Sequence, residues 1–200
     1  MFAEMKLSDF LEKIAAKTPT PGGGSVSAAV GAMGASLGVM TARYSEFSEA
    51  ETALDEIKNE FLTLVDADAE AYGQVNSAMS LPKDSDDTKR RRKEALQIAL
   101  GEASEVPLKG MLLANRGLKS LAELAPKCNK HLTSDLSAAS TFLESALLGC
   151  GENVRVNAIS LTDKVRRGRL EKERVRLTDE GKDLREQIRK GVEQLYAGQQ

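Results

Sequence analysis

Three carboxylates lie close together in the run Val65-Asp66-Ala67-Asp68-Ala69-Glu70-Ala71-Tyr72. Their neighbours are alanines, not the lysines or arginines that pair with acids on a helix surface. Asp66 and Glu70 share one face of a helix, whereas Asp68 points elsewhere. A carboxylate held against a pocket can have a shifted pKa that suits it to proton transfer. The alternative interpretation is a solvated acidic face.

A glycine-rich turn, TPTPGGGS at residues 18–25, leads into a run of small residues. Gly22, Gly23 and Gly24 let the backbone pass close to another group, and Ser25 stands where a helix N-cap is expected. The free N–H groups and the helix dipole at such a turn can hold an anion or a carbonyl. No Gly-Lys-Ser/Thr follows and no strand precedes the turn, which excludes the phosphate loop and the dinucleotide-binding fingerprint.

Two further groups of polar residues could carry chemistry. In the segment NKHLTSDL at residues 129–136, Ser134 or Asp135 can cap a helix, which leaves Asn129 unexplained. Further on, Asn153 and Asn157 share a helix face, and asparagine needs hydrogen-bond partners when buried in a helix. These two amides could bind a flat heteroaromatic ligand or satisfy a contact between helices.

Metal-dependent chemistry is not expected. The chain has a single histidine, His131, and no Glu-x-x-His or Cys/His cluster. A catalytic triad would have to use His131, whose polar surroundings favour a solvated or capping role. The basic run KRRRK at residues 89–93 could attract a polyanionic tail, but a solvated face is favoured.

Composition limits the class of protein. At 200 residues we expect a single domain, residues 1–200, and a net charge of −2 with 4% aromatic residues argues against a nucleic-acid partner. Cys128 and Cys150 form no paired motif, which favours a reducing, cytoplasmic location, and the amino terminus does not resemble a secretory signal. Residues 18–42 carry no charge, but their Gly, Ala and Ser content favours a buried helix over a membrane span.

Helical periodicity extends over nearly the whole chain. Apolar residues recur at helical spacing, and we expect helices near residues 7–14, 25–44, 48–79, 86–124, 136–161 and 163–196. An interruption and a kink are expected at Pro107. Gly31, Gly34 and Gly38 form a stripe that favours close helix packing. The predicted fold is an all-α, elongated bundle of about six helices that forms dimers through exposed apolar stripes.

Together, several blocks of the chain resemble the formiminotransferase-cyclodeaminase C-terminal family, which includes formimidoyltetrahydrofolate cyclodeaminase and methenyltetrahydrofolate cyclohydrolase. The blocks are TPTPGGGSVSA, VDADAEAY, LPKDSDDTKRRRKEALQIAL with EVPL, NKHLTSD and ENVRVNAISLTD, in the same order over about residues 5–195. The resemblance implies an all-helical homodimer or higher oligomer that acts on folate-bound one-carbon units, with no bound cofactor or metal.

The resemblance also implies a site. A tetrahydrofolate derivative is the expected substrate, and the carbon between N5 and N10 is the expected reaction centre. Asp135, Asp66 and Asp68 are the expected catalytic carboxylates. The expected substrate-binding residues are Gly22, Gly23, Gly24, Ser25, Asn129, Ser134, Asn153, Asn157 and Arg43. Because the chain lacks the lysine-rich stretch that family members carry after the second helix, the alternative is a catalytically impaired scaffold or a folate-binding module of the same fold.

Overall fold

The computed structural model describes residues 1–198. Within them it contains six α-helices and no strand, which confirms the predicted all-α class. The helices are α1 (Leu7–Ala15), α2 (Gly23–Tyr44), α3 (Ser48–Met79), α4 (Asp86–Leu124), α5 (Thr133–Ile159) and α6 (Lys164–Ala197). Short 3-10 turns, η1 (Phe2–Glu4), η2 (Ala125–Lys127) and η3 (Lys130–Leu132), lie before α1 and between α4 and α5.

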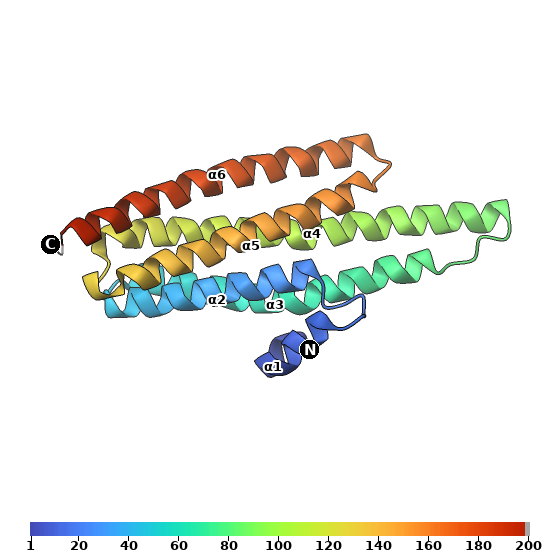
Figure 1. The fold of residues 1–200 in the computed structure, drawn as a ribbon. Helices are drawn as coiled ribbons and strands as arrows, with labels where there is room; N and C mark the ends of the chain where they lie inside the picture. The colour runs from blue at the N-terminus through green and yellow to red at the C-terminus, as the bar shows by residue number, and fades with distance from the viewer. Residues whose placement is uncertain (199–200) are drawn as a thin grey trace.

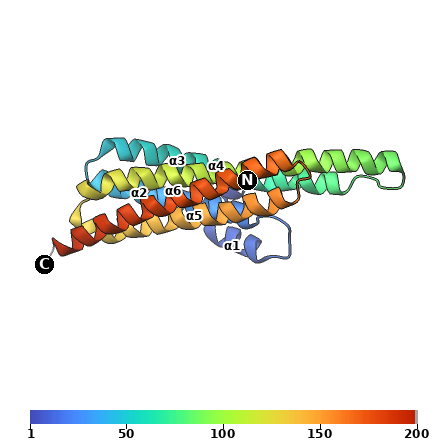
Figure 2. The ribbon, with the colours of Figure 1, turned by 90° about the horizontal axis from the view of Figure 1, so that it is seen from above.

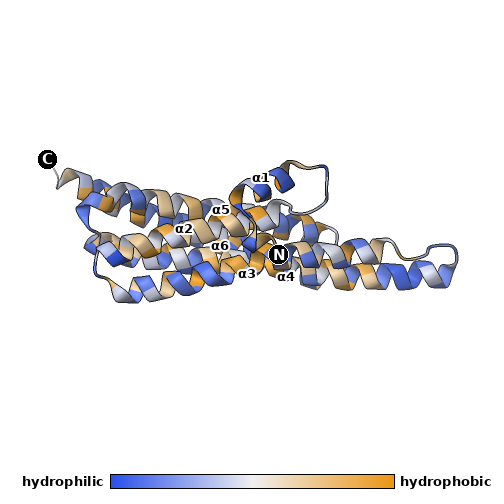
Figure 3. Cartoon of the chain, turned by 90° about the horizontal axis from the view of Figure 1, so that it is seen from below, coloured by the Kyte–Doolittle hydropathy of each residue, from blue (hydrophilic) through white to orange (hydrophobic). Residues whose placement is uncertain are grey.

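Helices α2, α3, α4 and α5 form an antiparallel four-helix bundle in which each helix packs against the next and α2 packs against α5 (Figure 1). Helix α6 covers the α4–α5 side, and η1 contacts α3. The α3–α4 hairpin extends beyond the other helices as an arm (Figure 2). Hydrophilic residues dominate the distal end of α4 in this arm (Figure 3). The bundle is therefore elongated, as its long helical segments predict.

Small residues allow α2 to enter the centre of the bundle. Ala28, Ala35 and Ala42 are buried, and a Cβ on Gly31 would lie 2.6 Å from the ring of Phe61. The glycine stripe is therefore a packing surface, as expected. By length and composition alone, helix α2 is long and apolar enough to cross a membrane. In its most apolar stretch, 56% of the residues are buried in the bundle.

Helix α4 continues through Pro107, so the expected interruption is wrong. Proline has no N–H, which leaves the carbonyl four residues earlier, that of Ala103, without its helical donor. The side-chain amide of Asn157 donates to this carbonyl at 2.9 Å. A hydrogen bond from α5 thus replaces the one that α4 lacks.

Two predicted capping roles are also wrong. The N-cap of α2 is Gly22, and Ser25 lies inside the helix. Helix α5 begins at Thr133 with Leu132 as N-cap, so neither Ser134 nor Asp135 occupies the cap position. At the start of α2, a carboxylate from another helix accepts the hydrogen bond that a capping side chain would accept.

Candidate functional site

A cavity of about 300 Å³ lies where the amino-terminal end of α2 meets α3, α4 and the last turns of α5. Six of the residues predicted from the sequence line this cavity, although they come from three separate segments. They are Gly22, Gly23, Gly24, Asp68, Asn153 and Asn157. The glycine turn, one of the three acidic residues and the two asparagines therefore form one site.

Asp68 lies against the first turn of α2. Its Oδ2 accepts hydrogen bonds from the backbone N–H of Ser25 at 2.8 Å and from the Ser25 hydroxyl at 3.0 Å. A Cβ on Gly24 would lie only 2.0 Å from Oδ1 of Asp68, so the close approach of the carboxylate requires glycine at this position. Asp68 on α3 thus satisfies a free N–H of α2 and places a negative charge at the positive end of its dipole.

The environment of Asp68 changes its proton affinity. Burial raises the pKa of the Asp68 carboxyl above its ordinary value, and the two hydrogen bonds from Ser25 oppose this effect. The buried thiol of Cys150 lies nearby, and burial together with the charge of Asp68 raises its pKa to about 12. Asp68 is therefore the lining group of the cavity suited to exchange a proton, while the Cys150 thiol stays protonated.

The two asparagines are half-buried, and each is held by one hydrogen bond. The Asn153 amide donates to the Gly149 carbonyl, and the Asn157 amide donates to the Ala103 carbonyl, both at 2.9 Å. The carbonyl oxygen of each amide has no partner among the described residues. Asn157 therefore satisfies a contact between helices, as one of the two interpretations predicted, and it also lines the cavity.

Four predicted residues lie at the opposite end of the bundle. The Asn129 side chain makes two hydrogen bonds at this end. Its amide donates to the Tyr44 carbonyl at 3.3 Å, and its oxygen accepts from the His131 N–H at 3.0 Å. Asp135 lies near the Cys128 thiol, whose pKa is raised by burial and, to a smaller extent, by the charge of Asp135. Ser134 is exposed at the start of α5. Arg43 projects outward and pairs with Glu51 at 2.7 Å.

The length of α2 separates these residues from the cavity. Helix α2 has 22 residues, and at 1.5 Å per residue it spans about 33 Å. Asn129 contacts the carboxyl end of α2, whereas Asp68 contacts its amino end. Within one chain the structure therefore does not bring Asp135 and Asp68 into the same site.

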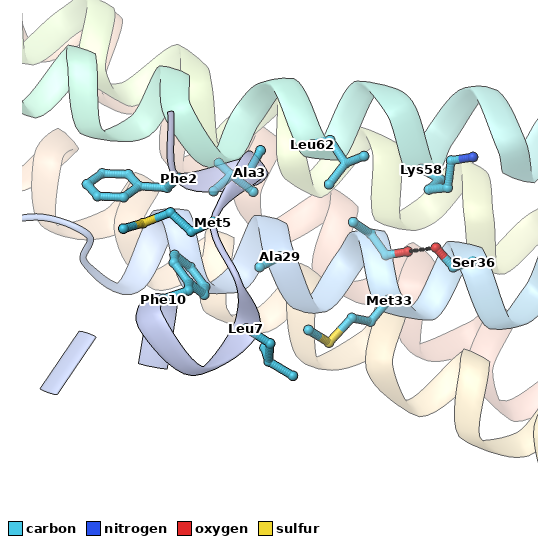
Figure 4. Close-up of a pocket in the computed structure, with 12 residues that line it drawn as sticks. Phe2, Ala3, Met5, Leu7, Phe10, Ala29, Met33, Ser36, Lys58 and Leu62 are labelled. Carbon is cyan, nitrogen blue, oxygen red and sulfur yellow. Dashed lines mark hydrogen bonds between the residues drawn. The ribbon is translucent and has the colours of Figure 1, made fainter. Parts of the chain in front are cut away.

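Asp66 has a different environment from Asp68. Its carboxylate accepts hydrogen bonds from the backbone N–H groups of Phe2 and Ala3, and so holds η1 against α3. Beside this contact lies a second cavity, of about 400 Å³, with mainly apolar walls that include Phe10 and Met33 (Figure 4). Asp66 therefore anchors the amino-terminal segment and does not line the cavity that contains Asp68.

Tyr72 and Thr20 line the cavity but were not expected in the site. Tyr72 was assigned to the apolar stripe of its helix, although it lies four residues after Asp68 and shares that face. That spacing is the sequence signal that could have identified it. Among residues 1–198, no three histidine, cysteine or acidic side chains gather in a group that could hold a metal ion.

The chain is similar to several known proteins. Residues 6–176 match the formiminotransferase-cyclodeaminase family. The chain is 35% identical over 173 residues to formimidoyltransferase-cyclodeaminase of Rattus norvegicus, covering 81% of this chain and 32% of the rat protein. It is also 35% identical over 170 residues to methenyltetrahydrofolate cyclohydrolase of Methylorubrum extorquens, covering 79% of this chain and 81% of that protein.

A solved structure has the same fold. Formiminotetrahydrofolate cyclodeaminase from Thermotoga maritima superposes with a TM-score of 0.88 at 26% identity, covering 98% of this chain and all of that chain. This chain spans only about a third of the length of the rat protein. The similarity to the Methylorubrum and Thermotoga proteins covers most or all of each.

Proposed function

Since the chain belongs to the formiminotransferase-cyclodeaminase family, we propose that it is a folate one-carbon enzyme acting on the carbon between N5 and N10 of tetrahydrofolate. The reaction is a cyclodeamination or the hydrolysis of methenyltetrahydrofolate, by general acid/base catalysis. The observation that carries this proposal is the Asp68 carboxylate, which has a raised pKa and lies in a cavity that also presents two asparagine amides.

Asp68 can serve in either reaction. In cyclodeamination, N10 attacks the formimino carbon on N5 and ammonia leaves, so one group must remove a proton from N10 and another must protonate the leaving nitrogen. In cyclohydrolysis, water adds to the cationic methenyl carbon and one carbon–nitrogen bond then opens. A carboxylate beside that carbon stabilises its positive charge and can take a proton from the water.

The cavity walls suit the pteridine end of the substrate. The volume of the cavity, about 300 Å³, lies at the lower end of the range for small-molecule sites. The carbonyl oxygens of Asn153 and Asn157 can accept hydrogen bonds from ring N–H groups, and Tyr72 offers an aromatic surface. The glycine turn leaves room for a flat ring close to the backbone.

We also propose that two chains assemble so that opposite ends of the bundle meet. The predicted residues fall into two groups at the two ends of α2, and an antiparallel pair would bring Asp135 of one chain near Asp68 of the other. Exposed apolar side chains on α2 and α5 support such an interface, with Met33 48%, Phe142 41% and Leu148 47% exposed.

An absorbance assay tests the catalytic proposal. Methenyltetrahydrofolate absorbs in the near ultraviolet, so its loss reports cyclohydrolase activity, and its formation from formiminotetrahydrofolate reports cyclodeaminase activity. Replacing a general acid/base group lowers turnover by about 10²–10⁴-fold, and we expect such a loss for Asp68→Asn. Glu70→Gln is the matched control, because Glu70 is an exposed acid on the same helix.

The outcomes separate the alternatives. Wild-type protein that converts neither substrate above the blank rate would overturn the enzymatic proposal. Saturable folate binding without turnover would then identify a binding module. Wild-type turnover in the Asp68→Asn variant would remove Asp68 from the mechanism, provided that circular dichroism shows the same helical content as the wild type.

A further inference from the structure

The two oxygens of the Asp68 carboxylate have different surroundings. Oδ2 accepts both hydrogen bonds from Ser25, from the backbone N–H at 2.8 Å and from the hydroxyl at 3.0 Å. Oδ1 accepts none from residues 1–198, and it is not one of the buried side-chain atoms that lack a partner there. The carboxylate is therefore held through one oxygen and open through the other.

The open oxygen faces the glycine turn of the cavity. A Cβ on Gly24 would lie 2.0 Å from Oδ1 and 2.8 Å from Oδ2, so Oδ1 is the oxygen nearer to this backbone. Gly24 and Asp68 both line the cavity. Because the lone pairs of Oδ2 are already used by Ser25, Oδ1 is the oxygen left to meet a ligand.

The Ser25 hydroxyl differs from the other serine hydroxyls of α2. Those of Ser27 and Ser36 donate to the helix carbonyl four residues earlier, each at 2.7 Å, as serines inside helices commonly do. The Ser25 hydroxyl donates to Asp68 on α3 instead. Ser25 is 0% exposed and does not line the cavity. Its hydroxyl is therefore directed at the carboxylate and out of reach of a ligand.

Ser25 is the group that favours the ionised form of Asp68. Within residues 1–198, Asp68 forms no ion pair, and the titratable groups that face it are Tyr72 on α3 and Cys150 on α5. Neither supplies a positive charge, and α4 contributes the apolar side chain of Ala103. Burial raises the pKa of the Asp68 carboxyl, and the two hydrogen bonds from Ser25 oppose that rise.

We infer that Oδ1 of Asp68 is the oxygen that exchanges a proton during the reaction, and that Ser25 is the positioning residue that directs it into the cavity. The inference rests on the proposed function. It gives Ser25 a role through Asp68, whereas the family resemblance placed Ser25 among the residues that bind the substrate.

The same oxygen can act in both halves of either reaction. As the attacking atom bonds to the one-carbon unit, Oδ1 takes a proton from it; this atom is the water oxygen in cyclohydrolysis and N10 in cyclodeamination. Oδ1 then returns the proton to the nitrogen whose bond to the carbon breaks. In cyclohydrolysis the hydroxyl of the adduct releases its remaining proton to solvent as the formyl group forms. In cyclodeamination the protonated formimino nitrogen leaves as ammonia.

The pH dependence of kcat in Ser25→Ala tests this role. The substitution removes a hydrogen bond that favours the ionised carboxylate, so the pKa of Asp68 should rise further. Because Oδ1 must start without a proton, the acid limb of the kcat profile should move to higher pH. On that limb kcat should fall about tenfold, as expected for one lost hydrogen bond to a charged group. KM should stay unchanged, since Ser25 does not line the cavity.

A matched control is Ser27→Ala. It removes a hydroxyl from the same helix, two residues further on, that donates to the Gly23 carbonyl and not to Asp68. Its acid limb should coincide with that of the wild type. If Ser25→Ala loses helical content, Ser25→Cys takes its place, because a thiol is a weaker donor of similar size. A smaller shift in the same direction is then expected.

A second measurement needs no turnover. Carbon-13 NMR of the side-chain carboxyl carbon of Asp68, assigned by the loss of its signal in Asp68→Asn, follows the titration directly. The carboxyl should titrate at higher pH in Ser25→Ala than in the wild type, and at the wild-type pH in Ser27→Ala.

The remaining outcomes contradict the inference in different ways. A raised KM with an unchanged acid limb would make Ser25 a substrate-binding residue. A loss of stability with the limb and the NMR titration in place would leave Ser25 only a role in capping α2. An equal shift in Ser27→Ala would also overturn the assignment. If the wild type converts neither folate, the proposed function fails and the role of Oδ1 fails with it, whereas the NMR titration still decides whether Ser25 controls the Asp68 carboxyl.

Discussion

Asp68 performs the role of an N-cap side chain for α2. The N-cap residue, Gly22, has no side chain, and the Ser25 N–H and hydroxyl donate hydrogen bonds to the Asp68 carboxylate on α3 instead. Gly24 makes room for that carboxylate. The same contact explains why the glycine turn and the acidic run belong to one site, although 43 residues separate Ser25 from Asp68.

The raised pKa of Asp68 predicts a pH dependence of stability. Because burial favours the protonated carboxyl, the folded state holds its proton to higher pH than the unfolded state does. Asp68 therefore lowers the free energy of unfolding as pH rises from its ordinary pKa of 3.8 through its folded pKa. Asp68→Asn removes this loss, so its stability relative to the wild type should increase as the pH rises above 3.8.

Urea unfolding at a series of pH values measures this difference. Glu70→Gln, which changes an exposed acid on the same helix, serves as the control for general charge effects. Parallel stability profiles for the wild type and Asp68→Asn would contradict the pKa shift.

Helices α4 and α5 are joined by a hydrogen bond that a proline makes necessary. Pro107 leaves the Ala103 carbonyl without a helical donor, and Asn157 supplies one. Both Ala103 and Asn157 line the cavity. The proline therefore fixes the position of a site residue on a neighbouring helix, and α4 remains continuous.

A double-mutant cycle tests this coupling. Asn157→Ala should lower the free energy of unfolding by about 1–3 kcal/mol, because it leaves the carbonyl of the buried residue Ala103 unsatisfied. Pro107→Ala restores the helical N–H, so Asn157→Ala should be less damaging in that background, with an interaction energy of about 1 kcal/mol. Denaturant unfolding of the four proteins gives this energy, and simple additivity would show that the two residues are not coupled.

The complete bundle separates the predicted residues into two groups at opposite ends of α2. One group surrounds Asp68 and the other contains Asn129 and Asp135. An antiparallel pair of chains would complete each site with residues from both copies. This arrangement would also cover the exposed apolar side chains of α2 and α5.

Mixing two inactive variants tests the shared site. Asp68→Asn and Asp135→Asn should each lose activity alone, but a heterodimer would contain one site with both carboxylates intact. Random reassembly should therefore restore about a quarter of wild-type turnover, because half of the dimers are mixed and one of their two sites is intact. Activity is measured in the co-refolded mixture and again after capture through two different tags, where the isolated heterodimers should have about half of wild-type turnover. Captured heterodimers without activity would show that the two ends do not share a site.

Local patterns predicted most of the fold. The helical segments follow from apolar spacing, and their observed bounds lie within about three residues of the expected ones for α2 to α6. The polar break after Met79 separates α3 from α4, as expected. The sequence also indicated that Asp66 and Asp68 point in different directions, because they are two residues apart on a helix.

The tertiary structure decided which partner each side chain meets. Asp66 holds the amino-terminal segment, Asp68 caps α2, and Asn157 compensates for Pro107. Helix formation depends on hydrogen bonds between residues four apart, which a short stretch of sequence specifies. The facing of two helices depends on how their surfaces pack, and this involves residues far apart in the chain. The sequence alone therefore determined the helices and the residues able to do chemistry, and only their packing divided those residues between the two ends of the bundle.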